Sequence, residues 1–461
     1  MSPLPPQPIS PLDGRYRSAV EGLGEHLSEA GLNRARVHVE VEWLVALTNR
    51  HMFGSQPLAA EQARALRSFA SDFGQREIDE LAALEAITRH DVKAVEYLVR
   101  SKLTELGLNG IAELTHFACT SEDINNLAYA LTIRAAVREV WLPRLRDVVA
   151  GLRSIAVDER STPMLAHTHG QPATPTTVGK EFAVFVARLE RGIGRIDAVD
   201  ILGKFSGATG TFAAHVAADP EADWPAISRE FVTSLGLTWN PLTTQIEPHD
   251  WQAELFSAIS RVNRILHNLC TDVWAYISMG YISQIPQAGA TGSSTMPHKI
   301  NPIRFENAEA NLELSSALLD SLAATLVTSR LQRDLTDSTT QRNIGVALGH
   351  SLLALDNLAR GLGEIAIARE AIAADLGANW EVLGEAIQTV IRAEVTAGRS
   401  SIADPYALLK ELTRGHRTGA DELREFVQKL DIGDAAKARL LELTPASYLG
   451  LAPELIDLLP D

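Results

Sequence analysis

The residues best suited to chemistry lie in one stretch, QAGATGSSTMPHKINP, which covers residues 287–302. Its first half is rich in glycine and alanine, which lets the backbone rearrange at little cost. Its second half brings Ser293, Ser294, Lys299 and Asn301 together, and the Asn-Pro pair that ends it is typical of a helix start. Because the first N–H groups of a helix and a nearby cation attract negative charge, the stretch predicts a loop that binds an anion.

Two other interpretations fit this stretch less well. Segments rich in Gly and Ser are usually linkers or turns, but Met296, Pro297 and Ile300 place apolar side chains among the polar ones, which a solvated linker does not need. A phosphate-binding P-loop requires a glycine directly before its lysine. Here His298 precedes Lys299, so the sequence excludes that motif.

A second polar segment, HTHGQPATP, holds two histidines, His167 and His169. Pro172 and Pro175 exclude a regular helix there, so we expect an extended segment. A histidine can exchange protons near neutral pH, and two histidines on an extended segment could also bind a metal. The pattern leaves three hypotheses open, namely a structural role, which is the commoner one for a lone histidine, an acid–base residue, and the metal site of a hydrolase. The lack of strand patterns argues against the metal site.

Four further polar segments carry side chains that could bind a substrate. They are Arg15-Tyr16, Arg89-His90-Asp91, Thr120-Ser121-Glu122 and the proline-broken segment around Gln245. Taken singly, each is equally typical of a surface turn or a helix cap, and Asp91 and Ser121 are predicted N-caps. Asn125 and Asn126 lie inside the helix expected after Ser121, where buried amides need partners, so we expect a polar cavity there.

The segment SRLQRDLTDSTTQR, residues 329–342, combines three arginines with several hydroxyls, among them those of Ser338 and Thr339. Arg333 and Arg342 could hold a phosphate through charge-assisted hydrogen bonds. The alternative to phosphate binding is that this segment is an ordinary charged turn between two helices.

Long helices must position these segments. Between residues 255 and 273, Leu, Ile and Val recur at alternating steps of four and three, which predicts a long straight helix packed along others. Similar apolar stripes occupy residues 182–196, 312–326 and 348–362. No stretch shows the alternation typical of a sheet core. We therefore expect an all-α fold built on a bundle of long helices.

At 461 residues the chain is long enough for two or three domains. We predict an N-terminal helical domain over residues 1–112 and a central long-helix bundle over residues 113–365. Residues 366–461, where shorter helical patterns are separated by Gly and Pro, are the expected C-terminal helical domain.

The composition of the chain argues against nucleic acid and membranes as binding partners. A net charge of −16 and a pI of about 5.3 provide no excess of cations to neutralise nucleic acid. Cys119 and Cys270 have no metal-ligand spacing, which favours a reduced, cytoplasmic protein. No apolar run is long enough to span a membrane, and the proline-rich start lacks an apolar signal core.

Several motifs together resemble one known family. GSSTMPHKINP resembles the signature loop of the fumarase/aspartase superfamily, whose members cleave C–N or C–O bonds and release fumarate. With HTHGQPATP, TSEDINN, SRLQRDLTDST and SPLDGRY near the start, the chain is similar to the adenylosuccinate lyase family in its bacterial form. The matching motifs are spread from Asp13 to about Gly349, so the resemblance covers most of the chain.

The resemblance implies a role for each matching position. Ser293 is the expected general base, which removes a proton from the carbon beside a carboxylate, and His169 is the expected general acid for the departing nitrogen. The residues that would hold the succinyl carboxylates are Ser294, Lys299 and Asn301. The expected phosphate contacts are Arg15, Tyr16, Arg333, Ser338 and Arg342. The other expected substrate contacts are Arg89, His90, Asp91, Thr120, Ser121, Glu122, Gln245, Asn307 and Thr339.

The resemblance also implies an architecture and a reaction. Members are three-domain all-α chains that assemble as homotetramers, with sites formed where three subunits meet. The expected reaction eliminates fumarate from adenylosuccinate, giving AMP, and from SAICAR, giving AICAR, in purine biosynthesis, with no cofactor and no metal. One alternative is a sister lyase of the superfamily that acts on argininosuccinate or fumarate. Such an enzyme would not need a phosphate-binding site. Another is a non-catalytic structural oligomer, against which Ser293, His169 and Lys299 argue.

Overall fold

The computed structural model describes residues 8–286, 296, 299–413 and 418–460. The chain divides into two compact units. The first comprises Met1–Leu145, Gly192–Arg264 and Ala310–Asp356, and the second comprises Arg146–Arg191, Ile265–Glu309 and Asn357–Asp461. Five long helices contribute residues to both units: α7 (Leu142–Asp158), α8 (Val178–Asp197), α11 (Asp250–Ser278), α12 (Ile303–Leu326) and α14 (Ile344–Gly363).

The first unit is otherwise built from shorter helices. They are α1 (Arg17–Leu27), α2 (Glu29–Asn49), α3 (Ala60–Ser71), α4 (Gln75–Thr88), α5 (Asp91–Glu105), α6 (Ser121–Ala135), α9 (Ala213–Ala218), α10 (Trp224–Ser234) and α13 (Thr336–Gln341), with 3₁₀ turns at Met52–Gly54 and Asn109–Leu114 and a π-helical turn at Ala136–Trp141. Strands β3 (Leu202–Gly203) and β4 (Thr238–Trp239) form a short parallel pair. Helix α2 lies at the centre, since it packs against α1, α3, α5 and α6.

An aromatic cluster anchors the core of the first unit beside α2. The ring of Trp43 lies 4.4 Å from that of Phe205 and 5.1 Å from that of Phe231. The indole N–H of Trp43 donates to the carbonyl of Phe117 at 3.1 Å, so its one polar atom is satisfied. Large aromatic side chains bury much apolar area, and this cluster fixes α2 against the loop that carries Phe205.

Buried polar contacts link the long helices inside the first unit. Asn263 of α11 donates to the hydroxyl of Ser315 in α12 at 3.0 Å and accepts from Ser351 in α14 at 2.7 Å. Ser315 donates in turn to the carbonyl of Ala347, and Trp141 donates to Ser351. A buried polar group without a partner is costly, so this network favours one register of the helices over shifted ones.

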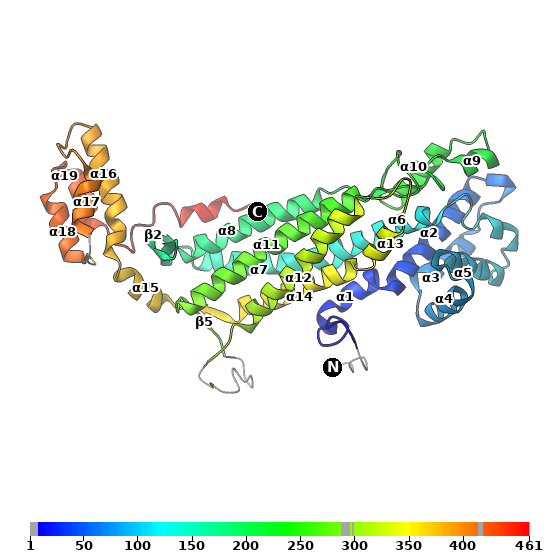
Figure 1. The fold of residues 1–461 in the computed structure, drawn as a ribbon, viewed down its shortest axis with the longest axis horizontal. Coiled ribbons are helices and arrows are strands. Elements are labelled where there is room, and N and C mark those ends of the chain that lie inside the picture. The colour runs from blue at the N-terminus through cyan, green and yellow to red at the C-terminus, as the bar shows by residue number, and fades with distance from the viewer. Residues whose placement is uncertain (1–7, 287–295, 297–298, 414–417, 461) are drawn as a thin grey trace. The chain divides into compact units, whose positions relative to one another are not determined.

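The second unit contains two small antiparallel sheets and a group of short helices. Its strands are β1 (Pro163–Thr168) paired with β2 (Gln171–Thr177), and β5 (Ile282–Gln284) paired with β6 (Ile365–Ile367). Its helices are α15 (Arg369–Gly377), α16 (Gly384–Thr396), α17 (Pro405–Thr413), α18 (Ala420–Lys429) and α19 (Asp434–Glu442), with 3₁₀ turns at Trp380–Leu383 and Glu454–Leu458. Helices α16 to α19 gather around their own apolar core, which includes Ile387, Ile391, Leu423 and Leu440 (Figure 1).

The predicted apolar stripes are confirmed as the buried faces of the long helices. In α11, Leu255, Ile259, Val262, Leu266 and Val273 are all buried. The stripes of α8, α12 and α14 are buried in the same way. The fold is mostly helical as predicted, but the expectation of an all-α chain overlooked the short strand pairs, which are too brief to show a period.

Three predicted helix starts are wrong by one residue. Helix α12 begins at Ile303, and the carbonyl of Pro302 accepts its first bonds, so Asn301 is not its N-cap. Thr120 rather than Ser121 caps α6, and its N–H donates to Asp123 at 2.8 Å. His90 rather than Asp91 caps α5, because its Nδ1 accepts from the N–H of Lys93.

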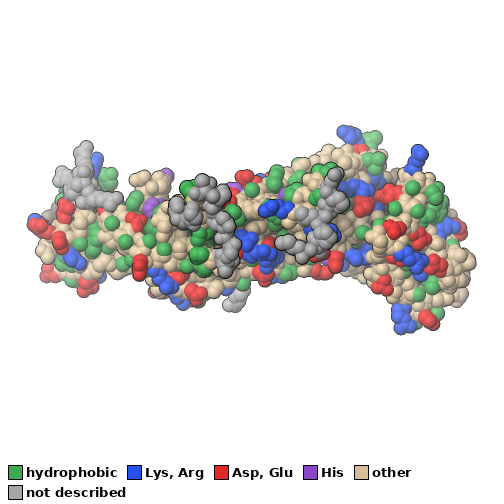
Figure 2. Space-filling view, turned by 90° about the horizontal axis from the view of Figure 1, so that it is seen from below, with side chains coloured by type: hydrophobic (Ala, Val, Ile, Leu, Met, Phe, Trp, Pro, Cys, Tyr) green, Lys and Arg blue, Asp and Glu red, His purple; other side chains and the backbone are tan. Residues whose placement is uncertain are grey.

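The surface carries charges of both signs. Figure 2 shows acidic and basic side chains interspersed on the face that it displays, with apolar side chains scattered among them. Of the helices in the described part of the chain, none combines the length and the apolar character that crossing a membrane would require.

Candidate active site

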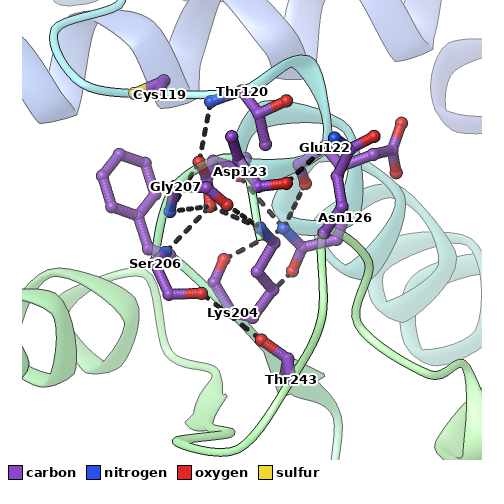
Figure 3. A network of polar contacts seen from close by, with 12 residues as sticks. Cys119, Thr120, Glu122, Asp123, Asn126, Lys204, Ser206, Gly207 and Thr243 are labelled. Carbon is purple, nitrogen blue, oxygen red and sulfur yellow. Dashed lines mark hydrogen bonds and ion pairs between the residues drawn. The ribbon is translucent and has the colours of Figure 1, made fainter. Parts of the chain in front are cut away.

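Asp123 holds the start of α6 against the loop that contains Lys204 (Figure 3). Its carboxylate accepts from the N–H of Thr120 at 2.8 Å and from the N–H groups of Ser206 and Gly207 at 2.9 and 3.1 Å. The ammonium of Lys204 lies 2.8 Å from the same carboxylate, and both side chains are completely buried. Such a pair is tolerated inside a protein only when further hydrogen bonds satisfy it, as they do here.

Asn126 fixes the same loop a second time. Its Oδ1 accepts from the N–H of Lys204 at 2.8 Å, and its Nδ2 donates to the carbonyl of Lys204 at 3.0 Å (Figure 3). The predicted partner for this buried amide therefore exists, but it is backbone rather than a polar cavity. Together, Asp123 and Asn126 make the segment Thr120–Glu122 a rigid platform at the N-terminal end of α6.

Glu122, on this platform, meets an arginine from the segment between α12 and α13. The Nη2 atom of Arg333 lies 2.9 Å from Oε1 of Glu122 and 3.8 Å from Oδ1 of Asp337. Its Nη1 donates to Oε1 of Gln245 at 3.3 Å, and Gln245 donates to the carbonyl of Ala208 at 2.9 Å. Three residues that were predicted as substrate contacts, Glu122, Gln245 and Arg333, thus lie together.

The contacts continue from Glu122 through α2. Asn125 donates to Oε1 of Glu122 at 2.7 Å and accepts from Nε of Arg36 at 2.9 Å. The guanidinium of Arg36 also donates to Asn33 and to Oδ2 of Asp91, each at 2.8 Å. Arg36 is almost fully buried, so its charge depends on these partners.

Asp91 joins this line of contacts to Arg342. Nη2 of Arg342 lies 3.3 Å from Oδ2 of Asp91, and Nη1 pairs with Glu29. We call the connected set the polar chain. Its members are Gln245, Arg333, Glu122, Asn125, Arg36, Asp91, Arg342 and Glu29.

A cavity of about 180 Å³ opens beside the Arg342 end of the polar chain. Ser10, Asp13 and Ser28 contribute to its lining together with Arg342. Asp13 belongs to the DGRY turn, whose Arg15 is exposed and places its guanidinium carbon 5.8 Å from the ring centre of Tyr16. The predicted phosphate contacts of the N-terminal turn therefore lie in the segment that borders this cavity.

The pKa values of the carboxyl groups reflect these surroundings. Burial alone would raise the pKa of Asp91, but Arg36, the N–H of Val92 and Arg342 hold it below its ordinary value. Burial raises the pKa of Asp337, which Arg333 opposes only in part. Hydrogen bonds from Thr336 and Arg330 lower the pKa of Asp334 to about 2.

Three more residues that were predicted to contact the substrate lie at the end of α4 and on α13. Arg89 ends α4 with a left-handed φ of 52°, and its side chain is exposed. Ser338 and Thr339 lie on α13, where the N–H of Ser338 donates to Asp337 at 2.6 Å.

His169 lies in the second unit, at the tip of the β1–β2 hairpin. Because Thr168 pairs with Gln171, the turn between the strands consists of His169 and Gly170, whose φ angles are 54° and 72°. Two successive positive φ angles are the mark of a type I′ turn. The turn leaves the side chains of both His167 and His169 exposed in this chain.

Three more predicted site residues belong to the second unit. Lys299 is exposed, and its N–H donates to the carbonyl of Met296 at 3.1 Å. Asn301 lies just before α12, and Asn307 on α12 accepts from Asn357 at 3.0 Å. Ser293 and Ser294 lie outside the described residues.

The polar chain includes two residues that the sequence analysis did not single out, Glu29 and Arg36. Asn33, which accepts a hydrogen bond from Arg36 on the same helix, was not selected either. A usable signal existed, since Asn33, Arg36 and Glu40 recur at steps of three and four and therefore share one face of the helix. Polar residues at buried helix positions need partners, so this pattern predicts a tertiary polar contact.

Among the residues that the structure describes, no three His, Cys, Asp or Glu side chains are grouped as they would need to be to hold a metal ion.

Comparisons with known proteins bear on the family and on the fold of the chain. Residues 14–313 match the family model described as Lyase, and residues 329–449 match the model described as Adenylosuccinate lyase C-terminal. The chain is 47% identical to the adenylosuccinate lyase of Escherichia coli (strain K12) over 451 residues, which is 97% of this chain and 98% of that protein. It is 46% identical to the adenylosuccinate lyase of Haemophilus influenzae, with the same coverage.

The fold itself is shared with solved structures of low sequence identity. A fumarate lyase from Mesorhizobium sp. BNC1 matches with a TM-score of 0.74 at 19% identity, over 95% of this chain and 97% of that one. A 3-carboxy-cis,cis-muconate lactonizing enzyme from Pseudomonas putida matches with a TM-score of 0.72 at 20% identity, over 95% of each chain. From its family models and its close relatives, the chain belongs to the adenylosuccinate lyase family.

Proposed function

We propose that the protein eliminates fumarate from adenylosuccinate, giving AMP, and from SAICAR, giving AICAR. The observation that carries this proposal is the polar chain, which gathers Glu122, Gln245, Arg333, Asp91 and Arg342 within one unit. The guanidinium groups of Arg333 and of Arg342, which lines a cavity, suit a phosphate dianion, which a nucleotide substrate has and argininosuccinate lacks. The adenylosuccinate lyases that resemble the chain over nearly its whole length support the same substrate.

In the proposed reaction, Ser293 acts as the general base. It takes the proton from the succinyl carbon beside a carboxylate, and the electron pair of that C–H bond becomes the new C=C bond of fumarate. The C–N bond breaks, and its electrons remain on the departing nitrogen. Negative charge builds up on the succinyl carboxylate before the bond breaks, and Lys299 and Asn301 are donors of the kind that stabilise it.

His169 supplies the proton that the departing nitrogen needs. An imidazole can give up a proton near neutral pH, so it suits the role of general acid. Its place in a two-residue turn fixes the backbone from which the ring projects. The proton taken by Ser293 and the proton given by His169 balance, so no redox partner enters the reaction.

We further propose that the active protein is a homotetramer with sites shared among subunits. The exposure of His169 in the single chain supports this, because acid–base catalysis works best where water is excluded. Neighbouring subunits would cover the hairpin and bring the loop at residues 287–302 to the substrate. The division into domains over residues 1–112, 113–365 and 366–461 and a cytoplasmic location belong to the same proposal.

The test is the release of fumarate and AMP from adenylosuccinate by the purified protein, followed by ultraviolet absorbance. We expect turnover without added metal. The variant Ser293→Ala should abolish turnover while substrate still binds, because it removes only the base. Substantial residual turnover in Ser293→Ala would refute the role of that serine, and no turnover by the unaltered protein would refute the proposed function.

A further inference from the structure

A second cavity in the first unit lies apart from the polar chain. It has a volume of about 520 Å³ and is lined by residues of α1, α2, α3 and α6. On α2, Arg34 and His38 line it, and each lies two positions from Arg36. Two positions correspond to about 200° around a helix, so this cavity and the polar chain lie on opposite faces of α2.

Arginines outnumber carboxylates in the lining of this cavity. Four arginines contribute to it, namely Arg34, Arg64, Arg67 and Arg134, beside the two glutamates Glu25 and Glu42. Arg67 is neutralised by Glu42, to which its Nε and Nη2 donate at 2.6 and 2.8 Å. None of the ion pairs formed within the described ranges includes Arg34, Arg64 or Arg134.

Two of these three arginines are held in place by backbone carbonyls rather than by carboxylates. Arg134 donates to the carbonyls of Gly236 and Leu235 at 2.6 and 3.2 Å, and Arg34 donates to the carbonyl of Glu25. A carbonyl orients a guanidinium without cancelling its charge. After Arg67 has paired with Glu42, three lining arginines remain beside the single carboxylate of Glu25, so in a chain whose net charge is −16 this cavity carries a local excess of positive charge.

The cavity also offers apolar and hydroxyl groups. Ala35, Ala70, Leu131 and Ala135 provide apolar surface, and Ser68 and Thr132 are among its hydroxyl residues. Small-molecule sites typically have volumes of about 300–1,000 Å³, with apolar walls and a few polar groups that fix orientation. Both the size and the mixed lining suit an organic ligand better than a bare inorganic ion.

We propose that this cavity binds a small organic phosphate at a second site, separate from the candidate active site. Arginine forks match the oxygens of a phosphate, and the apolar wall would contact the organic part of the ligand. The exposed Arg64 provides a charge that the ligand can pair with, since it has no carboxylate partner among the residues with described positions.

The test measures the stoichiometry and affinity of AMP binding to the full-length protein by equilibrium dialysis. We expect two classes of AMP site in the unaltered protein. Arg64→Glu should weaken one class by about tenfold or more, since a charge-assisted contact is lost and a repulsion is added. Ser68→Trp should remove the same class by filling the cavity, while Arg342→Met should weaken only the other class.

The control is Arg76→Glu, which reverses an exposed arginine on α4 that does not line the cavity. It should leave both classes unchanged. If only the class sensitive to Arg342→Met exists, or if Arg64→Glu and Ser68→Trp bind AMP like the unaltered protein, the proposal is wrong. It is also wrong if inorganic phosphate fills the second class as tightly as AMP does. If the proposed catalytic function is wrong, the class of AMP sites that is sensitive to Arg342→Met is affected. The class of AMP sites that is sensitive to Arg64→Glu remains.

Discussion

The Nη2 atom of Arg36 lies 2.8 Å from Oδ2 of Asp91, and this contact joins the middle of α2 to the first turn of α5. The side chain of Arg36 is 2% exposed, whereas that of Asp91 is 25% exposed. One end of the pair is therefore sealed in the protein, and the other end borders solvent and Arg342. Arg36 sets the position of a carboxylate that a ligand could reach.

Arg36→Met should destabilise the protein, because Asp91 and Asn125 lose the donor that they share. Breaking a fully buried pair costs about 3–5 kcal/mol, and the partial exposure of Asp91 reduces this to about 2–3 kcal/mol. The free energy of unfolding in urea measures the effect. Arg36→Lys keeps the charge and should lose less, and equal losses in the two variants would show that charge at this position does not matter.

Arg342→Met should raise the KM for adenylosuccinate while changing kcat much less. If Arg342 contacts the phosphate in both the ground state and the transition state, its loss removes uniform binding, about 10- to 100-fold in KM. Steady-state kinetics measure the split between KM and kcat. Arg330→Met is the matched control, since Arg330 is 82% exposed and pairs with Asp334. An unchanged KM in Arg342→Met would remove the phosphate assignment and favour a sister lyase.

His169→Asn should abolish most activity without destabilising the hairpin. Asparagine adopts positive φ readily and Asn-Gly is favoured in type I′ turns, so the backbone at φ 54° is kept. Loss of a general acid costs about a hundredfold to ten-thousandfold in kcat. Thermal unfolding and kcat, measured on the same sample, separate the two effects. His169→Val is the contrasting variant, which should strain the turn by about 1–2 kcal/mol. Activity above a tenth of normal in His169→Asn would contradict the role of His169 as general acid.

Stability should fall as the pH rises above neutral, because of His116. Burial would lower its pKa, but the Glu40 carboxylate, whose Oε1 lies 2.6 Å from Nδ1, outweighs this and raises it, with help from Glu96 and Asp123. A raised folded-state pKa adds stability that is complete below the unfolded value of about 6.5 and is lost as the pH passes the folded value.

The free energy of unfolding in urea, measured at about pH 6 and at about pH 9, gives the size of this loss. The two pH values lie on either side of the range in which a histidine is expected to titrate. His116→Asn is the matched control, since His116 has a φ of 57° that asparagine tolerates. The variant should show a smaller change between the two pH values. An identical pH dependence in both proteins would rule out the His116–Glu40 pair as its cause.

The sequence allowed the long helices to be predicted because one periodic property, apolar spacing, determines which face is buried. The stripe from Leu255 to Val273 in α11 is an example. Arg36 could not be placed in the same way, since its partners Asp91 and Asn125 are 55 and 89 residues away and no local pattern names them. The predicted cap of α6 was wrong for a smaller reason, since Thr120 and Ser121 are both good N-cap residues and the sequence does not decide between them. At α5 the better N-cap residue, Asp91, already lies in the helix, and His90 caps it instead.

The polar chain has a consequence for the incoming substrate. Arg342 already pairs with Glu29 and Asp91, and Arg333 already pairs with Glu122, so both guanidinium groups have carboxylate partners before a substrate binds. If phosphate binds at these arginines as proposed, a dianion would compete with the carboxylates more effectively than a singly charged ligand. The internal acids would then select for a doubly charged group before any bond is broken.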